Sequence, residues 1–433
     1  MRVAFLTLGC KVNYYETEII MEQFKNRGFE ICEFSDHAEV YVVNTCTVTN
    51  MADRKSRQMI HRAKKKNPDS LVVAVGCYVE SAGEKILEDA SVDAAFSNKD
   101  KGQLAELIIQ RFQLHAQGKT TGVEHEPKHR TRAYLKVQDG CNQFCTYCMI
   151  PYVRGRGKLV STPEDQALEE IRALADKGYK EVVLTGIHLS SYGVDWSGEK
   201  NFVKLQGRHL LDLIKKAAQV PGIERIRLGS LEPRIIVEEF LQGLKDIPQF
   251  CPHFHLSLQS GSQGVLRRMN RHYTPVEYRE KVDLIRQYFE HPAITTDVIV
   301  GFPGETEEEF QETRDFLDQI RLADIHVFPY SVRSGTRAAA MEGQVRPEIK
   351  KIRADILIEA TKKYKEDYAS YFLGKEEEVI FEETVVENDT TYLCGLNDRY
   401  VRIGITQEKA EEMGLSSGDM ARVLVDKIFC QDN

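Results

Sequence analysis

A short stretch, residues 139–156, carries three cysteines at the spacing C-x3-C-x2-C: Cys141, Cys145 and Cys148. The chain starts without a secretion-signal pattern, so a tight cysteine cluster indicates a metal rather than disulfides. Three thiolates leave one iron of a cubane iron–sulfur cluster without a protein ligand, whereas electron-transfer clusters usually have four. The spacing therefore predicts a cluster whose open iron binds another molecule. The alternative is a zinc knuckle, which needs four ligands, and no fourth Cys or His follows nearby.

Three more cysteines, Cys10, Cys46 and Cys77, each stand directly after an apolar, β-branched run. Strand and helix patterns alternate over residues 1–113, which predicts an open, parallel α/β sheet. Because the carboxyl ends of parallel strands meet at one edge, where such folds hold ligands, we expect these thiols to converge on a second three-thiolate site. The preceding glycines, Gly9 and Gly76, let the backbone turn close to a bulky group. Buried cysteines that merely end strands are the alternative.

The first motif resembles the signature of the radical S-adenosylmethionine (SAM) enzymes. Together with LGCKVNYYETE, VNTCTVTNMADRKSRQ and AVGCYVES, it makes the whole chain similar to the methylthiotransferases of that superfamily. The sequences of these motifs are most similar to those of the branch that acts on threonylcarbamoyladenosine in tRNA. The resemblance implies two [4Fe–4S] clusters and six catalytic cysteines. Cys141, Cys145 and Cys148 would hold the cluster that binds and reduces SAM. Cys10, Cys46 and Cys77 would hold an auxiliary cluster that supplies or activates sulfur.

Between residues 132 and 372, six strand patterns alternate with helical ones, which predicts a partial (β/α)6 barrel with its function at the strand carboxyl ends. By the resemblance, these ends bind SAM through its amino group, ribose and adenine, and an arginine binds its carboxylate or a phosphate. The candidate SAM-binding residues are Thr185, Gly186, Ser230, Glu232, Gln259, Arg268, Val300 and Tyr330. A Ser or Gln at a strand end also often forms local backbone bonds, which is the alternative for those positions.

Four histidines of this central region, His188, His253, His255 and His326, are candidate ligands or bases. Ordinary surface or core histidines are the alternative, and the sequence contains nothing that separates the two interpretations.

Residues 373–433 change to short strand patterns separated by Gly, Asn and Asp. The segment resembles a TRAM domain, a small OB-like β-barrel that binds RNA. It contains 6 Lys and Arg against 14 Asp and Glu, an unusual balance for a role in which phosphate contacts supply most nonspecific affinity. The candidates for a local RNA face are Arg399, Arg402 and Arg422, with Tyr392 or Tyr400 stacking on a base. A merely structural barrel is the alternative, and the basic helix predicted within residues 52–66 is an equal candidate for tRNA contact.

The predicted fold is therefore α/β with three domains, which suits a length of 433 residues. An N-terminal open α/β sheet domain with the auxiliary cluster spans 1–113, and a polar linker spans 114–131. The radical-SAM domain spans 132–372 and the TRAM domain spans 373–433. No apolar run is long enough to span a membrane, and the amino terminus lacks a signal-peptide pattern. We expect a cytoplasmic protein that does not bind membranes.

The resemblance also implies a reaction: a methylthio group is inserted at carbon 2 of the adenine in N6-threonylcarbamoyladenosine, just 3′ of the anticodon. One SAM donates the methyl group and a second forms a 5′-deoxyadenosyl radical. The implied partners are the tRNA anticodon loop and an electron donor such as a flavodoxin or ferredoxin system, while the sulfur donor stays unknown. Two alternatives share this chemistry, with isopentenyladenosine in tRNA or a ribosomal-protein aspartate as substrate. A remote alternative is a non-catalytic, RNA-binding iron–sulfur protein, although such a protein gains nothing from open irons.

Overall fold

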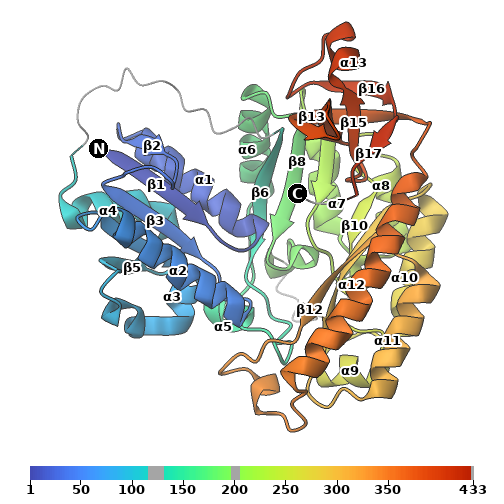
Figure 1. The fold of residues 1–433 in the computed structure, drawn as a ribbon, viewed down its shortest axis with the longest axis horizontal. Coiled ribbons are helices and arrows are strands. Elements are labelled where there is room, and N and C mark those ends of the chain that lie inside the picture. Colours follow the sequence, from blue (N-terminus) through green and yellow to red (C-terminus); the bar gives the residue numbers. More distant parts are fainter. Residues whose placement is uncertain (116–130, 197–204, 431–433) are drawn as a thin grey trace. The chain divides into compact units, whose positions relative to one another are not determined.

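A computed structural model describes residues 1–115, 131–196 and 205–430 (Figure 1). These residues form two compact units, which are described separately. The first unit contains the N-terminal residues up to 115 together with 139–159 and 331–339, and the rest of the described chain forms the second. Most of the predicted linker, residues 116–130 of 114–131, lies outside the described residues.

The first unit is built on a five-stranded sheet with the strand order β2-β1-β3-β4-β5. All its strand pairs are parallel, as the sequence predicted. Its strands are β1 (Arg2–Thr7), β2 (Glu30–Cys32), β3 (Val40–Thr45), β4 (Leu71–Gly76) and β5 (Ala94–Phe96). The edge strand β2 was not predicted, because three residues are too few to show a periodic pattern.

Helices cover both faces of this sheet. They are α1 (Lys11–Lys25), α2 (Asn50–Lys66), α3 (Cys77–Ala82) and α4 (Leu104–Phe112). In β3, Val40 and Val42 pack into the core that contains Phe24 of α1, while Val43 packs into the core that contains Ile60 of α2. A strand that is buried on both faces needs apolar side chains at every position. This explains the continuous apolar run in the sequence.

The register of the sheet makes three strands end at the same level. Thr7 lies opposite Asn44, and Thr45 lies opposite Gly76. The residues that follow β1, β3 and β4 are therefore placed at one edge of the sheet.

The second unit contains the six parallel strands that the sequence predicted. They lie in two sheets, β7-β6-β8-β9 and β10-β11-β12. Isolated parallel bridges from Ile226 to Phe250 and from Leu231 to Leu256 link the two sheets. The six predicted strands are β6 (Arg132–Asp139), β8 (Glu181–Gly186), β9 (Arg225–Leu228), β10 (His253–His255), β11 (Ala293–Val300) and β12 (Asp324–Pro329). A seventh, the short β7 (Val160–Ser161), was not predicted.

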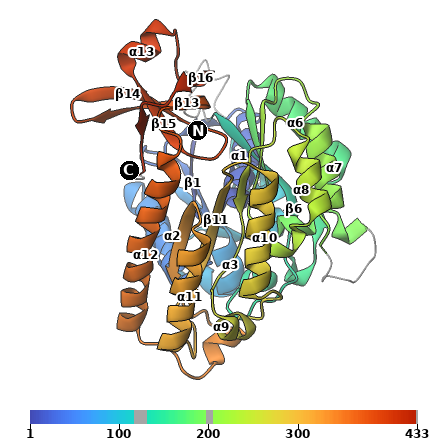
Figure 2. The same ribbon diagram turned by 90° about the vertical axis from the view of Figure 1, so that its right-hand side faces the viewer.

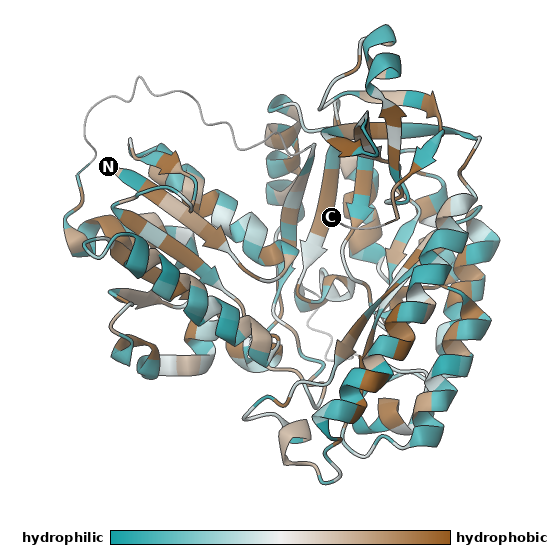
Figure 3. Cartoon of the chain, in the orientation of Figure 1, coloured by the Kyte–Doolittle hydropathy of each residue, from teal (hydrophilic) through white to brown (hydrophobic). Residues whose placement is uncertain are grey.

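Helices separate these strands, and Figure 2 shows α10, α11 and α12 standing side by side over one face of β11. Thr306 and Glu309 form the capping box that starts α11, with both reciprocal hydrogen bonds present. In Figure 3 the strands are mostly brown and the helices carry the teal, hydrophilic residues. The helices are α6 (Glu164–Asp176), α7 (Arg208–Ala217), α8 (Glu238–Lys245), α9 (Gln263–Arg268), α10 (Pro275–Tyr288), α11 (Glu307–Ile320) and α12 (Pro347–Ser370). Among the described helices, none combines the length and the apolar character needed to cross a membrane.

The end of the chain forms a five-stranded antiparallel sheet with the order β16-β13-β14-β15-β17. Its core contains Phe381, Ile403 and Val423, packed against Phe372, which follows α12. The elements are β13 (Glu376–Glu387), β14 (Thr390–Leu396), β15 (Arg402–Thr406), α13 (Gln407–Glu412), β16 (Met420–Leu424) and β17 (Lys427–Ile428).

A buried arginine, Arg227 of β9, joins this terminal sheet to the parallel strands of the same unit. Its side chain is fully buried, and Nε donates to Oε1 of Glu181 at 2.8 Å. Its Nη1 donates to the carbonyl oxygen of Asp398 at 2.7 Å, and the guanidinium lies 3.8 Å from the ring centroid of Tyr400. Tyr400 is thus occupied inside the unit, so the expectation that it stacks on an RNA base is not supported. The Nε of Arg399 likewise donates to the carbonyl oxygen of His291.

Replacing Glu181 with glutamine leaves the Arg227 charge buried without a carboxylate. Breaking a buried ion pair in this way costs about 3–5 kcal/mol, so we expect Glu181→Gln to lower the free energy of unfolding by about that amount. The measurement is urea denaturation followed by the fluorescence of the single tryptophan, Trp196. The control is Asp355→Asn, because Asp355 and Lys351 form an exposed pair of a kind that contributes about 1 kcal/mol or less. Equal losses in the two variants would contradict the role of the buried pair.

Candidate metal and cofactor sites

The sheet edge of the first unit brings Cys10, Cys46 and Cys77 to the ends of β1, β3 and β4. The backbone there is packed too closely for side chains at the preceding glycines. Gly9 has a φ of +103°, and a Cβ on it would lie 2.9 Å from Sγ of Cys46. Gly76 has a φ of +108°, and its Cβ would lie 2.6 Å from the carbonyl oxygen of Thr45. Both positions therefore require glycine.

The environment of these cysteines fits a group that binds thiolates. Burial raises the pKa of the Cys46 thiol to about 11, and the nearby Cys77 and Cys10 add to the rise. Cys77 is also buried, whereas Cys10 is exposed. Metal ligation requires the thiolate form, and several thiolates at one buried edge need a compensating positive charge. An iron–sulfur cluster supplies that charge, so the three residues fit the auxiliary cluster that the sequence implies.

An asparagine network holds the loop that carries Cys10. Asn13 donates through Nδ2 to the carbonyl oxygens of Leu8, at 2.7 Å, and of Thr45, at 3.1 Å. Asn44 donates to the carbonyl oxygen of Asn13 at 3.0 Å. These buried bonds connect the start of α1 to the end of β3, so the positions of Cys10 and Cys46 depend on each other.

A buried guanidinium, that of Arg154, reaches the same edge from the segment that follows the C-x3-C-x2-C motif. Its Nε lies 3.4 Å from Sγ of Cys77 as a hydrogen-bond donor. Nη1 and Nη2 donate to the two oxygens of Glu16 at 3.0 and 2.9 Å. Nη2 also donates to Oδ1 of Asn13 at 2.7 Å, and Nη1 to Asp139 at 3.2 Å. Arg154 therefore connects the segment of the first cysteine motif to the edge of the second.

Glu16 is shared between two buried cations. It accepts a hydrogen bond from Nζ of Lys101 at 2.5 Å in addition to the Arg154 pair. Burial lowers the pKa of Lys101, and Glu16 opposes this effect. The pKa of Arg154 is raised because Glu16, Cys77 and Asp139 together outweigh the opposing effect of burial. Arg154, which Glu16 holds together with Lys101, thus places its guanidinium next to Cys77.

Cys141, Cys145 and Cys148 lie in the irregular segment between β6 and α5 (Ile150–Val153), and all three are partly exposed. A turn is formed by the N–H of Cys148, which donates to the carbonyl oxygen of Cys145 at 3.0 Å. Gly140 admits no side chain, since its Cβ would lie 1.8 Å from the carbonyl oxygen of Lys158. Irregular backbone with partly exposed thiols suits a cluster that must also accept a further ligand.

Residues 331–339 belong to the same compact unit and support both segments. Arg333 is buried and donates to Asp53 at 2.7 Å and to Thr47 at 2.5 Å, close to Cys46 in the sequence. The N–H of Ala338 donates to the carbonyl oxygen of Thr146, between two cysteines of the first motif.

Sequence reasoning missed Arg154, Glu16, Lys101 and Arg333. Glu16 showed a usable signal, because it falls at helical spacing among the buried residues Asn13, Thr17 and Ile20 of α1. The other three show no periodic pattern in the sequence that would predict their burial.

The candidate SAM-binding residues lie in the second unit, most of them at or just beyond the strand carboxyl ends. Thr185 and Gly186 end β8, and a Cβ on Gly186 would lie 2.9 Å from Oε1 of Gln138. The N–H of His188 donates to that same Oε1 at 2.7 Å. Burial lowers the pKa of His188 to about 3, so this ring is neutral.

The ends of β10, β11 and β12 bring three candidates together. The N–H of Ile299 donates to the carbonyl oxygen of Gln259, and the N–H of Tyr330 donates to that of Val300. The Tyr330 ring lies 5.3 Å from the ring of Phe302 and is buried. Gln259 has a φ of +72°, an unusual backbone conformation for a residue with a side chain.

The remaining candidates differ in their surroundings. Ser230, after β9, is exposed, whereas Glu232 is buried and accepts from Nε of Arg234 at 2.8 Å. Arg268 lies on α9, where it pairs with Glu309 at 2.6 Å. Arg268 also donates to the carbonyl oxygens of Pro303 and Gly304, in the loop that follows β11.

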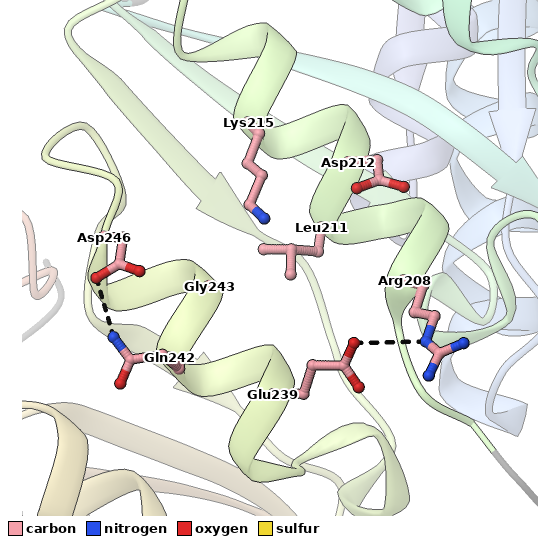
Figure 4. A pocket seen from close by; sticks show the side chains of 8 residues that line it. All are labelled: Arg208, Leu211, Asp212, Lys215, Glu239, Gln242, Gly243 and Asp246. Atoms are coloured by element: carbon pink, nitrogen blue, oxygen red, sulfur yellow. Dashed lines mark hydrogen bonds and ion pairs between the residues drawn. The ribbon is translucent and has the colours of Figure 1, made fainter.

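A depression between α7 and α8 is shown in Figure 4. Its polar side chains pair with one another, Arg208 with Glu239 at 3.5 Å and Gln242 with Asp246 at 3.0 Å. Because helices rather than strand ends form it, we assign it no part in the chemistry.

Family models match two parts of the chain. The radical SAM superfamily model matches residues 135–317, and the model described as uncharacterized protein family UPF0004 matches residues 2–97. The second match covers Cys10, Cys46 and Cys77, and the first covers Cys141, Cys145 and Cys148.

Relatives match over almost the whole chain. The threonylcarbamoyladenosine tRNA methylthiotransferase MtaB of Bacillus subtilis is 40% identical over 93% of this chain and 89% of its own. The protein of the same name from Aquifex aeolicus is 38% identical over 98% of this chain and 100% of its own. The tRNA-2-methylthio-N(6)-dimethylallyladenosine synthase of Syntrophus aciditrophicus is 34% identical over 87% and 82%.

Solved structures are similar in fold. The radical SAM methyltransferase TsrM of Kitasatospora setae, in a complex with tryptophan and a SAM analogue, has a TM-score of 0.53 at 16% identity. The similarity covers 76% of this chain and 73% of that one, and at this identity it concerns the fold alone.

Replacing Arg154 with lysine tests the contact to Cys77. Lysine keeps the positive charge beside Glu16 but cannot reproduce the five donors of a guanidinium. Hydrogen bonds to cluster sulfur raise the reduction potential. We therefore expect a more negative potential for the cluster at Cys10, Cys46 and Cys77 in Arg154→Lys, measured by an EPR-monitored redox titration of the reconstituted protein.

The matched control is Arg156→Lys, because Arg156 is exposed and lies only two residues further along the chain. An unchanged potential in Arg154→Lys, with both clusters assembled, would show that Arg154 does not donate to the ligand sulfur.

Proposed function

The chain belongs to the radical-SAM tRNA methylthiotransferases, and we propose that it inserts a methylthio group at carbon 2 of the adenine in N6-threonylcarbamoyladenosine, 3′ of the anticodon in tRNA. The product is 2-methylthio-N6-threonylcarbamoyladenosine. The observation that carries this proposal is the set of two cysteine trios in one compact unit of a chain with full-length tRNA methylthiotransferase relatives. Relatives named for threonylcarbamoyladenosine reach 40% identity, whereas the Syntrophus aciditrophicus relative named for dimethylallyladenosine is 34% identical.

The six cysteines are proposed to hold two [4Fe–4S] clusters. Cys141, Cys145 and Cys148 hold the cluster that binds SAM, and Cys10, Cys46 and Cys77 hold the auxiliary cluster. When bound, the clusters and SAM supply radical chemistry, which an unactivated C–H bond requires and no set of polar side chains provides. Arg154 keeps the two cysteine segments in a fixed relation and places a cation beside Cys77.

The strand ends of the second unit are proposed to bind SAM. The backbone at Thr185 and Gly186 would bind the amino group, and Ser230 and Glu232 would bind the ribose. Gln259, Val300 and Tyr330 form the neighbouring part of the site. Arg268 is proposed to bind a carboxylate or a phosphate. Because its guanidinium also pairs with Glu309, it would bind both groups at once.

The domain plan follows from the same proposal. Residues 1–113 form the methylthiotransferase domain and residues 132–372 a partial (β/α)6 radical-SAM barrel, which the six parallel strands in sequence order support. Residues 373–433 form an OB-like TRAM domain, which the five-stranded antiparallel sheet supports. A tRNA substrate also implies a cytoplasmic location and an electron donor such as flavodoxin or ferredoxin.

Two variants of the reconstituted enzyme test the separate roles of the two cysteine trios. Cys141→Ala should abolish reductive SAM cleavage, because the cluster that binds SAM loses a ligand. Cys10→Ala should retain SAM cleavage and abolish methylthio insertion. The measurements are 5′-deoxyadenosine by chromatography and the modified nucleoside by mass spectrometry, with an anticodon stem-loop RNA that carries threonylcarbamoyladenosine.

Cys430→Ala is a suitable control, because this cysteine follows β17 and belongs to neither trio. Product formation by Cys10→Ala would refute the auxiliary role of Cys10, and SAM cleavage by Cys141→Ala would refute the assignment of the first trio.

A further inference from the structure

Three polar side chains meet on one face of the β10-β11-β12 sheet: His255, Asp297 and His326. The register pairs His255 with Thr295 and His326 with Asp297. Because side chains alternate along a strand, these four residues share a face. The opposite face is apolar and buried, with Phe254 and Val298 completely covered.

Asp297 holds both imidazole rings. Its Oδ2 lies 3.3 Å from Nε2 of His255, and its Oδ1 lies 3.2 Å from Nδ1 of His326. The other nitrogen of His255, Nδ1, lies 2.9 Å from Oγ1 of Thr295. The two rings are stacked, with centroids 5.6 Å apart. Both nitrogens of His255 are therefore used within the cluster, and its role is to fix Asp297.

His326 is the member that faces outward. Its side chain is 54% exposed, against 13% for His255. The hydrogen bond with Asp297 raises the pKa of His326, against the opposing effect of burial. Burial alone would raise the pKa of the Asp297 carboxyl. The hydrogen bonds from His255 and His326 outweigh this effect and lower the pKa. With Nδ1 directed at Asp297, a protonated His326 presents Nε2–H as a donor to a ligand.

The neighbours of this donor on the same face suit a modified purine. Phe328 lies two residues further along β12 on the same face and is 44% exposed, so its ring is available to a base. The charges of Asp324 and Lys365 pair with each other at 3.3 Å. The candidate SAM-binding residues Gln259, Val300 and Tyr330 lie at or beyond the carboxyl ends of these three strands.

We propose that His326, held by Asp297 and His255, donates Nε2–H to the threonyl carboxylate of the modified base and so selects this substrate. The inference rests on the proposed function. Threonylcarbamoyladenosine carries a carboxylate on its N6 substituent, whereas the isopentenyl group is wholly apolar. An imidazolium held by a partly buried carboxylate is a directed cationic donor, and charge-assisted hydrogen bonds to carboxylates are the strong ones. An apolar isopentenyl group would leave this donor unpaired, which disfavours its binding.

The experiment measures binding of anticodon stem-loop RNAs to the reconstituted full-length enzyme with SAM, without reductant, by fluorescence anisotropy. One RNA carries threonylcarbamoyladenosine, and a second carries the same group with the carboxylate converted to a carboxamide. Wild-type enzyme should prefer the carboxylate by about tenfold or more. His326→Gln should reduce that preference to below about threefold.

The matched control is His209→Gln, because His209 lies on α7, where its ring contacts Trp196 edge-on. It should keep the wild-type preference.

A His326→Gln enzyme that still prefers the carboxylate tenfold would overturn the inference, while product formation by the wild type would leave the proposed function intact. The inference would also be overturned if the wild-type enzyme contained a stoichiometric metal other than iron that His326→Gln lacked. His255, Asp297 and His326 would then form a metal site. If wild-type enzyme fails to modify the first RNA, the proposed function itself fails.

Discussion

The buried pair between Arg154 and Glu16 is the interaction on which both cysteine trios depend. Glu16 lies in the helix that follows Cys10, and Arg154 lies six residues after Cys148. A buried ion pair contributes little net stability, because desolvation offsets the attraction, but removing one partner is strongly unfavourable. The pair therefore acts mainly as a geometric constraint. It requires the segment with Cys141, Cys145 and Cys148 to lie against the sheet edge that carries the other three.

The same ion pair places the positive charge of Arg154 beside the thiol of Cys77. Thiolate ligands at a buried edge are costly without cations, as the raised pKa of Cys46 indicates. Arg154 and Lys101 supply two positive charges next to Cys77 and share one carboxylate. The cysteines and this charged network belong to one compact unit.

Local patterns in the sequence predicted the scaffold well. The parallel strands β1, β3 and β4 and the six strands of the second unit follow from periodicity, and the cysteine trios follow from spacing and position at strand ends. Two kinds of feature were not predictable. Arg154 looks like a loop residue, because its burial depends on Glu16, Asn13 and Asp139, which are distant in sequence. Tyr400 looked like an RNA-stacking residue, but the guanidinium of Arg227, from a distant part of the sequence, lies 3.8 Å from the centroid of its ring. Tertiary contacts decide both outcomes, and a single sequence does not reveal them.

The central claim concerns the substrate, and nucleoside mass spectrometry of tRNA from cells with and without the gene tests it most directly. The account predicts that 2-methylthio-N6-threonylcarbamoyladenosine disappears in the deletion strain, that its unthiolated precursor accumulates, and that a plasmid copy restores the product. Loss of the isopentenyl analogue instead would preserve the radical chemistry and contradict the substrate. If neither nucleoside changed, a tRNA substrate would be contradicted altogether.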